Sequence, residues 1–255
     1  MNLLLENRIH LVTGGASGIG EATVRTLAAE GATPIILDRN ADKGNALAEE
    51  LKVPFLEVDL TDDEQLARTV RAVLDAHGAI DGVINNAGIN DGVGLSRSPE
   101  KFRTSLDKNL THAFALVRYA REALENSKHG VIVNVLSKVA FTGQGDTSGY
   151  AAAKGALAAL TREWAIDFAP HGVRVNAVAP AEVATPMYDN WLNSLPDPEA
   201  TRHAIEQRIP LGNRFTTPQE IADTILFLAS PRSSHTTGQI LFIDGGYTHL
   251  DRAFS

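Results

Sequence analysis

Short runs of apolar residues alternate along the chain with longer stretches in which apolar residues recur every three or four positions. Most of the short runs are continuous, which is typical of parallel strands covered on both faces. They predict strands at Ile9–Thr13, Pro34–Leu37, Pro54–Val58, Gly82–Asn85, Val131–Val135, Arg174–Val178 and Ile240–Ile243. The longer stretches predict helices at Gly20–Glu30, Ala41–Leu51, Asp62–His77, Pro99–Asn126, Gly149–Pro170 and Pro218–Ala229.

This alternation predicts an α/β fold: a doubly wound parallel sheet of about seven strands with helices on both faces. No long linker interrupts the 255 residues, so we expect one domain over residues 1–255. The segment 181–216 breaks the rhythm, because it is longer and more polar and carries four of the eleven prolines. Such insertions are often lids or binding loops, and we expect this one to bound a substrate site. The alternative is that this segment is a surface loop with no functional role.

A glycine-rich turn, Thr13-Gly14-Gly15-Ala16-Ser17-Gly18-Ile19-Gly20, follows the first predicted strand and opens a helix. Glycines let the backbone approach a pyrophosphate, and a helix N-terminus favours its negative charge. Asp38 ends the second predicted strand, where an acid can bind the ribose hydroxyls of a dinucleotide. A carboxylate there repels a 2′-phosphate, which favours NAD over NADP. Arg39 follows directly and is a possible phosphate ligand.

Tyr150 and Lys154 lie four residues apart at the start of an Ala-rich helical stretch, so they share a helix face. A free tyrosine has a pKa near ~10, and a nearby cation favours the phenolate. The pair can therefore serve as a general acid/base toward a hydroxyl. Ser137 follows a predicted strand and can place a second hydroxyl beside the tyrosine.

Together these motifs resemble the short-chain dehydrogenase/reductase family from about residue 6 to Gly246. Its cofactor loop is matched by Thr13-Gly14-x-x-x-Gly18-x-Gly20, the motif after its fourth strand by Asn85-Asn86-Ala87-Gly88, and its catalytic tetrad by Asn109, Ser137, Tyr150 and Lys154. The resemblance implies a single-domain Rossmann fold and hydride transfer between a nicotinamide cofactor and a carbonyl or alcohol. The chain is thus expected to be an NAD(P)-dependent oxidoreductase acting on CH–OH groups.

The resemblance also implies the residues that hold the cofactor. They are Gly14, Ser17, Gly18, Ile19, Gly20, Asp38, Asp59, Leu60, Asn86, Ala87, Gly88, Tyr150, Lys154, Pro180, Val183 and Thr185. The family usually has glycine after the proline at position 180, whereas this chain has Ala181, which puts the local loop geometry in question.

At the reacting centre the resemblance makes Tyr150 the acid/base, with Lys154 lowering its pKa and bonding the nicotinamide ribose. Ser137 orients the substrate oxygen, and Asn109 holds a water that extends a proton path. The family often has a second serine before the active one, but here that residue is Leu136, so the acting hydroxyl is not ambiguous.

The segments expected to face the substrate are rich in amides, hydroxyls and carboxylates, which favours a polyol or sugar over a steroid or fatty acyl group. The alternative is that these groups simply face solvent. Stretches around Gln144, around Glu182 and in the tail 244–252 resemble the bacterial L-fucose dehydrogenase group, which oxidises an aldose at its anomeric carbon to a lactone. We therefore expect Asn90, Ser137, Gln144, Tyr150 and Glu182 to contact the substrate.

Composition excludes several other functions. The net charge is −8 without a basic stripe, which argues against nucleic-acid binding. No apolar run approaches ~20 residues, so no spanning helix is expected. There is no cysteine, and the eight histidines lack ligand spacing, so we expect no metal. Residues 1–7 lack a cationic start and a long apolar run, which argues against a secretory signal and for a cytoplasmic protein.

Two alternatives to a sugar dehydrogenase stay open. One is a reductase of 3-oxoacyl or other ketone substrates. The other is a catalytically silent NAD-binding redox sensor, against which the intact Ser137, Tyr150 and Lys154 argue. The family resemblance also implies a homotetramer, whose tail, residues 249–255, can reach a neighbouring subunit's active site or be a frayed terminus.

Overall fold

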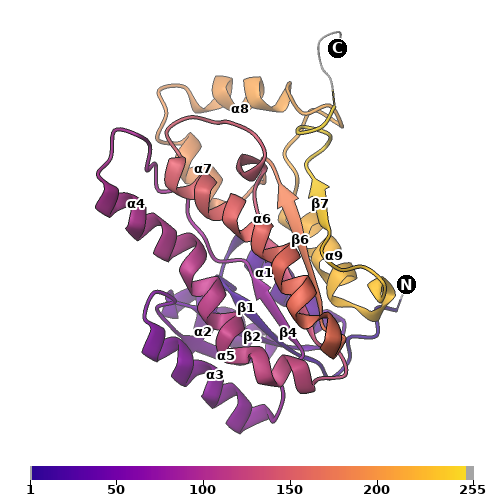
Figure 1. Ribbon diagram of the computed structural model, residues 1–255. Coiled ribbons are helices and arrows are strands. Elements are labelled where there is room, and N and C mark those ends of the chain that lie inside the picture. The colour runs from indigo at the N-terminus through magenta and orange to yellow at the C-terminus, as the bar shows by residue number, and fades with distance from the viewer. Residues whose placement is uncertain (1, 251–255) are drawn as a thin grey trace.

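The computed structural model describes residues 2–250 and contains one seven-stranded parallel sheet (Figure 1). The strand order is β3-β2-β1-β4-β5-β6-β7, so the side on which successive strands are added changes between β1 and β4. The strands are β1 Ile9–Thr13, β2 Thr33–Asp38, β3 Phe55–Glu57, β4 Gly82–Asn85, β5 Val131–Val135, β6 Arg174–Pro180 and β7 Ile240–Ile243. This confirms the expected α/β fold.

Helices cover both faces of the sheet. They are α1 Gly18–Ala29, α2 Ala41–Leu51, α3 Asp63–His77, α4 Pro99–Leu106, α5 His112–Asn126, α6 Ser148–Phe168, α7 Pro186–Leu192, α8 Pro198–Glu206 and α9 Pro218–Ala229. The described residues also contain four short helical turns: η1 Asp107–Thr111, η2 Lys138–Ala140, η3 Ala169–His171 and η4 Pro231–Ser233.

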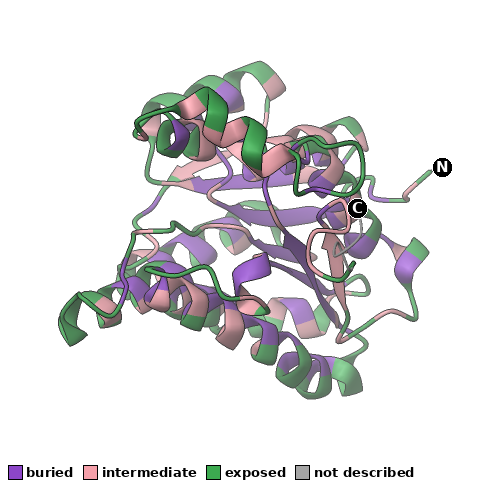
Figure 2. Ribbon diagram, turned by 90° about the horizontal axis from the view of Figure 1, so that it is seen from above, coloured by how far each residue is buried: buried purple, intermediate pink, exposed green. Residues whose placement is uncertain are grey.

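The hydrophobic core forms two layers, one on each side of the sheet (Figure 2). Side chains of α3, α5 and α6 pack on one face, around Leu66, Leu116 and Leu157. Those of α1, α2 and α9 pack on the other, around Leu27 and Ile225. Strand side chains alternate between the two layers, so central strands are buried on both faces, which explains their continuous apolar sequence.

The structure differs from the predicted elements mainly in two places. The predicted helix Pro99–Asn126 is interrupted by η1, a turn of π-helix that ends just before His112. The segment 181–216 contains α7 and α8, which were not predicted, and both begin with proline at the first turn. Short helices of this kind carry too little apolar periodicity to be recognised, whereas proline suits a helix start.

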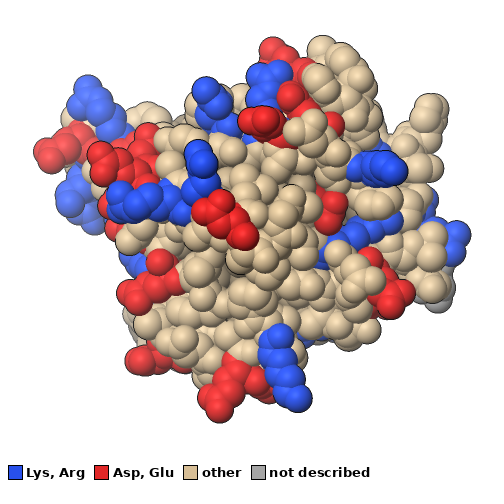
Figure 3. Space-filling view, turned by 90° about the horizontal axis from the view of Figure 1, so that it is seen from below, with Lys and Arg blue, Asp and Glu red and all other residues tan. Residues whose placement is uncertain are grey.

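The molecular surface shows no concentration of basic charge on the face drawn in Figure 3. Acidic and basic side chains are intermixed toward its edges, around a broad uncharged centre. Within residues 2–250, no helix is long and apolar enough to cross a membrane. The predicted contact of the tail with a neighbouring subunit concerns residues 249–255, of which 251–255 lie outside the described residues.

Candidate active site

A cleft of about 470 Å³ opens where the strands end and the strand order reverses. Open α/β sheets bind their ligands at this position. Most of the predicted site residues line it: Gly14, Ser17, Gly18, Ile19, Asp38, Asp59, Leu60, Asn86, Ala87, Gly88, Ser137, Tyr150, Lys154, Pro180, Val183 and Thr185. Five predicted residues are not part of its lining, namely Gly20, Asn90, Asn109, Gln144 and Glu182.

The glycine loop between β1 and α1 packs so closely on itself that side chains are excluded from it. A Cβ on Gly20 would lie 2.1 Å from the Gly14 carbonyl oxygen, so no side chain fits there. The Asn86 amide donates to the carbonyl oxygens of Thr13 and Gly14 at 2.9 and 3.1 Å, which ties the loop after β4 to this turn. Gly20 therefore shapes the loop from behind and does not line the cleft.

The start of α1 presents backbone N–H groups to the cleft. Its N-cap, Ser17, makes no side-chain cap hydrogen bond. Gly18 has φ +58°, and a Cβ there would lie 3.3 Å from Thr185 on the opposite wall. A helix N-terminus beside a narrow, side-chain-free loop fits the pyrophosphate of a dinucleotide.

Asp38 lies at the end of β2 and faces the glycine loop. Its Oδ2 accepts a hydrogen bond from the Ala16 backbone N–H at 3.1 Å, and its Oδ1 accepts one from Asn40 at 3.0 Å. These two bonds fix the carboxylate at the cleft wall. Arg39 also lines the cleft, so a cation stands beside this acid.

The adenine end and the opposite wall are arranged by loops after β3 and β6. Asp59 accepts hydrogen bonds from the Thr61 backbone and hydroxyl, which hold the pKa of its carboxyl below its usual value. Val183 pairs with Thr216 in an isolated bridge, and the Thr185 hydroxyl caps α7 by accepting from Tyr188 N–H at 3.3 Å. Ala181 lines the cleft without disturbing this arrangement.

Ser137, Tyr150 and Lys154 meet at one end of the cleft. Tyr150 and Lys154 share a face of α6, and the Lys154 Nζ lies 5.7 Å from the centre of the Tyr150 ring. Lys154 is 2% exposed and donates to the Val135 carbonyl oxygen at 2.7 Å. Burial lowers the pKa of Lys154 to about 8. The side chain is therefore still protonated at neutral pH, but it gives up its proton more readily than an exposed lysine.

The lowering of the Tyr150 pKa by Lys154 stays a prediction for the complex with cofactor. Burial raises the pKa of Tyr150 to about 12, and a hydrogen bond with Ser137 only partly offsets this. The physical reason is that desolvation disfavours the phenolate more than the nearby groups favour it.

Asn109 lies in η1 and is 1% exposed. Its Oδ1 accepts from the Ile89 N–H at 2.7 Å, and its Nδ2 donates to the Ser105 carbonyl oxygen at 2.9 Å. A Cβ on Gly88 would lie 3.1 Å from this Oδ1 and 3.2 Å from the Lys154 Nζ, so Asn109 and Lys154 flank the same backbone. The Asn109 side chain thus ties η1 to the loop after β4.

Two of the predicted substrate residues lie on loops that pack together beside the site. Asn90 and Gln144 are both exposed. The Gly149 N–H donates to the Val93 carbonyl oxygen at 3.0 Å, and a Cβ on Gly94 would clash with Asp146. The loop after β4 and the loop before α6 therefore pack against each other where α6 begins.

Glu182, the other predicted substrate residue outside the cleft lining, has a different environment from the one expected. It is 7% exposed and forms an ion pair with Lys138, the residue after Ser137. The Lys138 Nζ also lies 4.2 Å from the centre of the Tyr247 ring. Burial, followed by the charge of Glu182 and its hydrogen bond, raises the pKa of Tyr188, which lines the cleft.

Several cleft residues were not singled out from the sequence. They include Asn40, Lys43, Lys108 and His112. His112 follows Asn109 by three positions and thus shares its helix face, a signal that the sequence does contain. The others are surface-type residues on loops or helix starts, whose direction depends on tertiary structure.

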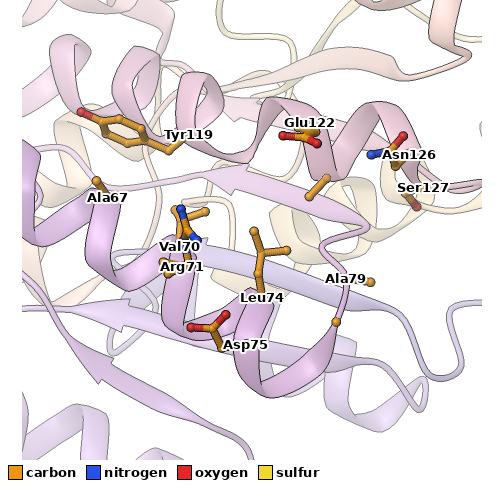
Figure 4. A pocket seen from close by; sticks show the side chains of 12 residues that line it. Ala67, Val70, Arg71, Leu74, Asp75, Ala79, Tyr119, Glu122, Asn126 and Ser127 are labelled. Carbon is orange, nitrogen blue, oxygen red and sulfur yellow. The ribbon is translucent and has the colours of Figure 1, made fainter.

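A second hollow, of about 560 Å³, lies between α3 and α5 (Figure 4). Arg71 and Asp75 come from α3, and Tyr119, Glu122 and Asn126 from α5. It contains none of the predicted site residues, so the chemistry belongs to the smaller cleft. Among residues 2–250, no group of three His, Cys, Asp or Glu side chains could hold a metal ion.

Comparison with known proteins gives extensive matches. A family model described as enoyl-(acyl carrier protein) reductase matches residues 14–248. A 3-oxoacyl-[acyl-carrier-protein] reductase of Thermotoga maritima is 38% identical over 248 residues, covering 95% of this chain and 98% of the relative. The L-fucose dehydrogenase of Mus musculus is 36% identical over 242 residues, covering 94% of this chain and 88% of the relative. The ligand-free aldohexose dehydrogenase of Thermoplasma acidophilum has a TM-score of 0.91 at 30% identity, covering 98% of each chain.

Proposed function

Since the chain belongs to the short-chain dehydrogenase/reductase family of NAD(P)-dependent oxidoreductases, we propose that its substrate is an aldose, such as L-fucose, which it oxidises at the anomeric carbon to a lactone. The observation that carries the proposal is that the loop of Asn90 packs against the loop of Gln144, which leads into α6 and Tyr150. The exposed amide side chains of these loops suit a ligand with many hydroxyl groups.

We further propose NAD as the cofactor, in preference to NADP. The carboxylate of Asp38 is fixed at the cleft wall by two backbone N–H groups, and each oxygen retains a lone pair for a ribose hydroxyl. A 2′-phosphate at this position would meet a negative charge. Arg39 lies next to it and is the residue on which NADP binding would depend.

The roles of the site residues follow from their positions. Tyr150 receives the proton of the anomeric hydroxyl, and Ser137, hydrogen-bonded to it, orients the substrate oxygen. Lys154 holds a positive charge behind the phenol. The oxidised nicotinamide, when bound, accepts the hydride and adds a positive charge that favours the phenolate. The high pKa of Tyr150 in the protein alone therefore falls when the cofactor is present.

Asn109 is assigned to holding η1 and the loop after β4 in place. Its side-chain amide is engaged with Ile89 and Ser105, and a water held by Asn109 on the proton path stays a prediction. Glu182 is assigned to fixing Lys138 and Tyr188 at the edge of the site, in place of a direct bond to the sugar. Gln144 and Asn90 remain the candidate sugar ligands.

The alternative activity is reduction of 3-oxoacyl or other ketone substrates, favoured by the similarity to the Thermotoga maritima reductase. The test is a panel of aldoses and of 3-oxoacyl thioesters with both cofactors, followed by the change in nicotinamide absorbance. Oxidation of aldoses with NAD supports the proposal. Reduction of 3-oxoacyl thioesters with no activity on any aldose replaces it by the alternative.

We propose that the protein acts as a cytoplasmic homotetramer. The exposed side chains of Phe114 on α5 and Ile166 on α6 give these neighbouring helices apolar surface that a second copy can bury. β7 lies at an edge of the sheet and its residues are only partly buried. The cytoplasmic location follows from the need for a pool of NAD. Mass measurement in solution tests the assembly.

A further inference from the structure

Tyr188 is an aromatic residue of the cleft wall, and the roles above give it no part in substrate binding. It lies in the first turn of α7, where its backbone N–H donates to the Thr185 hydroxyl at 3.3 Å. Its side chain is partly buried and lines the same cleft as Ser137 and Tyr150. The capped start of α7 therefore fixes the point from which this side chain reaches the cleft.

Two further aromatic rings hold the ring of Tyr188 in place. The ring centres of Trp191 and Phe215 lie 5.2 and 4.9 Å from that of Tyr188, and both contacts are edge-to-face. Phe215 is buried, and the Arg202 guanidinium carbon lies 4.9 Å from its ring centre. Edge-to-face pairs favour one relative orientation of the rings. The hydroxyl of Tyr188 therefore has a fixed position as well.

This hydroxyl is hydrogen-bonded to the carboxylate of Glu182. Glu182 is buried behind the cleft lining and forms an ion pair with Lys138. The Lys138 Nζ also lies 4.2 Å from the centre of the Tyr247 ring. The ammonium is thus enclosed by a carboxylate and an aromatic face, and Glu182 carries its negative charge in this pair.

The charge of Glu182 decides the direction of its hydrogen bond with Tyr188. An ionised carboxylate accepts hydrogen bonds and donates none, so the single hydroxyl hydrogen of Tyr188 is committed to Glu182. The phenol oxygen keeps its acceptor capacity and has no other hydrogen to offer. A ligand group that bonds this oxygen from the cleft must bring the hydrogen itself. Hydroxyl and N–H groups can do so, whereas carbonyl, thioester and ether oxygens cannot.

We propose that Tyr188 is a substrate-binding residue whose phenol oxygen accepts a hydrogen bond from a non-reacting hydroxyl group of the aldose. This inference rests on the proposed function and adds a requirement to it, namely a hydroxyl donor besides the anomeric one. The contacts join Tyr188 to the reacting end of the cleft, because Glu182 bonds both Tyr188 and Lys138, the residue after Ser137. The keto and thioester oxygens of a 3-oxoacyl group only accept, so they cannot satisfy this position.

The first test uses the wild-type enzyme, NAD and an aldose that it oxidises. The aldose is compared with analogues in which one non-reacting hydroxyl is replaced by hydrogen or by fluorine, which cannot donate a hydrogen bond. At one position we expect both analogues to raise KM by roughly 5- to 100-fold, because they lose the same bond. The value of kcat should change little, since this contact does not alter at the reacting carbon. Deoxy analogues that bind weakly while every fluoro analogue binds like the parent sugar would overturn the proposal.

Tyr188→Phe assigns the contact to this residue. The variant keeps the ring and its packing on Trp191 and Phe215, so its Tm should stay near that of the wild type. Its KM for the parent aldose should rise to the value of the deoxy analogue, and the variant should no longer distinguish these two sugars. Analogues altered at other hydroxyl groups should keep their wild-type ratios to the parent. A role in packing alone would instead affect all the sugars by one common factor.

Trp191→Phe is the matched control, because it alters the same group of rings at a residue outside the cleft lining. It should keep the wild-type selectivity, and loss of the discrimination in this control would assign the effect to packing and overturn the inference. Aldose oxidation with the same selectivity in wild type and Tyr188→Phe would overturn the inference and leave the proposed function standing. Wild-type enzyme that oxidises no aldose would overturn the proposed function and the inference together.

Discussion

Lys138 and Glu182 form a buried ion pair that joins the end of β5 to the end of β6, directly behind the reacting Ser137. Their side chains are 10% and 9% exposed. The pair therefore holds together the two loops that bound the substrate side of the cleft, and its removal should affect stability as well as activity.

We expect Glu182→Ala to destabilise the protein by about 3–5 kcal/mol, because it leaves the Lys138 ammonium buried without its partner. For a domain of this size, Tm should fall by roughly 10 °C in calorimetry. Gln144→Ala, at an exposed position, is the matched control and should keep the wild-type Tm. The double variant Lys138→Met/Glu182→Leu should recover most of the loss. An unchanged Tm in Glu182→Ala would show that the pair is not buried in solution.

Tyr150→Phe removes one hydroxyl and should lower kcat by ~10²–10⁴-fold, the usual contribution of a general acid/base. The ring still fills its place on α6, so the affinity for NAD, measured by calorimetric titration, should be retained. Turnover within tenfold of wild type would reject Tyr150 as the proton-transfer residue.

Lys154→Met should abolish turnover but raise the thermal stability at neutral pH. The folded pKa of Lys154 is about 8, below the ordinary value of 10.5. Below the folded pKa the buried charge is fully present and destabilises the fold. The destabilisation, of about 3 kcal/mol for a shift of this size, is relieved as pH rises from the folded to the unfolded pKa. Chemical denaturation of both proteins across this range should therefore show a stability difference that shrinks with pH, and a constant difference would contradict the burial of a charged Lys154.

Asp38→Ala should move cofactor preference toward NADP. The variant loses the acceptor for the ribose hydroxyls and the repulsion of a 2′-phosphate, while Arg39 stays at the cleft. The ratio of kcat/KM with NAD to that with NADP measures the shift. Wild-type preference for NADP would refute the role of Asp38.

Much of the fold could be predicted from the sequence, because central parallel strands such as Val131–Val135 are buried on both faces and read as continuous apolar runs. Most of the cleft could be predicted as well, because the glycine turn and Asp38 follow strand ends, which converge at one edge of the sheet. The π-helical turn at Asp107–Thr111 could not, because it depends on how Asn109 bonds to the loop after β4.

The pairing of Lys138 with Glu182 was equally hidden, because the two residues are 44 positions apart and Glu182 was expected to contact the substrate. His112 has an ordinary helical position, and only the packing around it shows that its ring is buried at the cleft. Residues whose role depends on contacts between distant loops are thus the ones that sequence reasoning misplaced or missed.

The most direct test of the central claim, oxidation of an aldose at its anomeric carbon with NAD, uses L-fucose carrying deuterium at that carbon. The account predicts that deuterium appears in the reduced nicotinamide, in equal amount to the lactone formed, when cofactor and product are analysed by NMR and mass spectrometry. Reduced cofactor without deuterium, or no reduction with any labelled aldose while a 3-oxoacyl thioester is consumed, would contradict it.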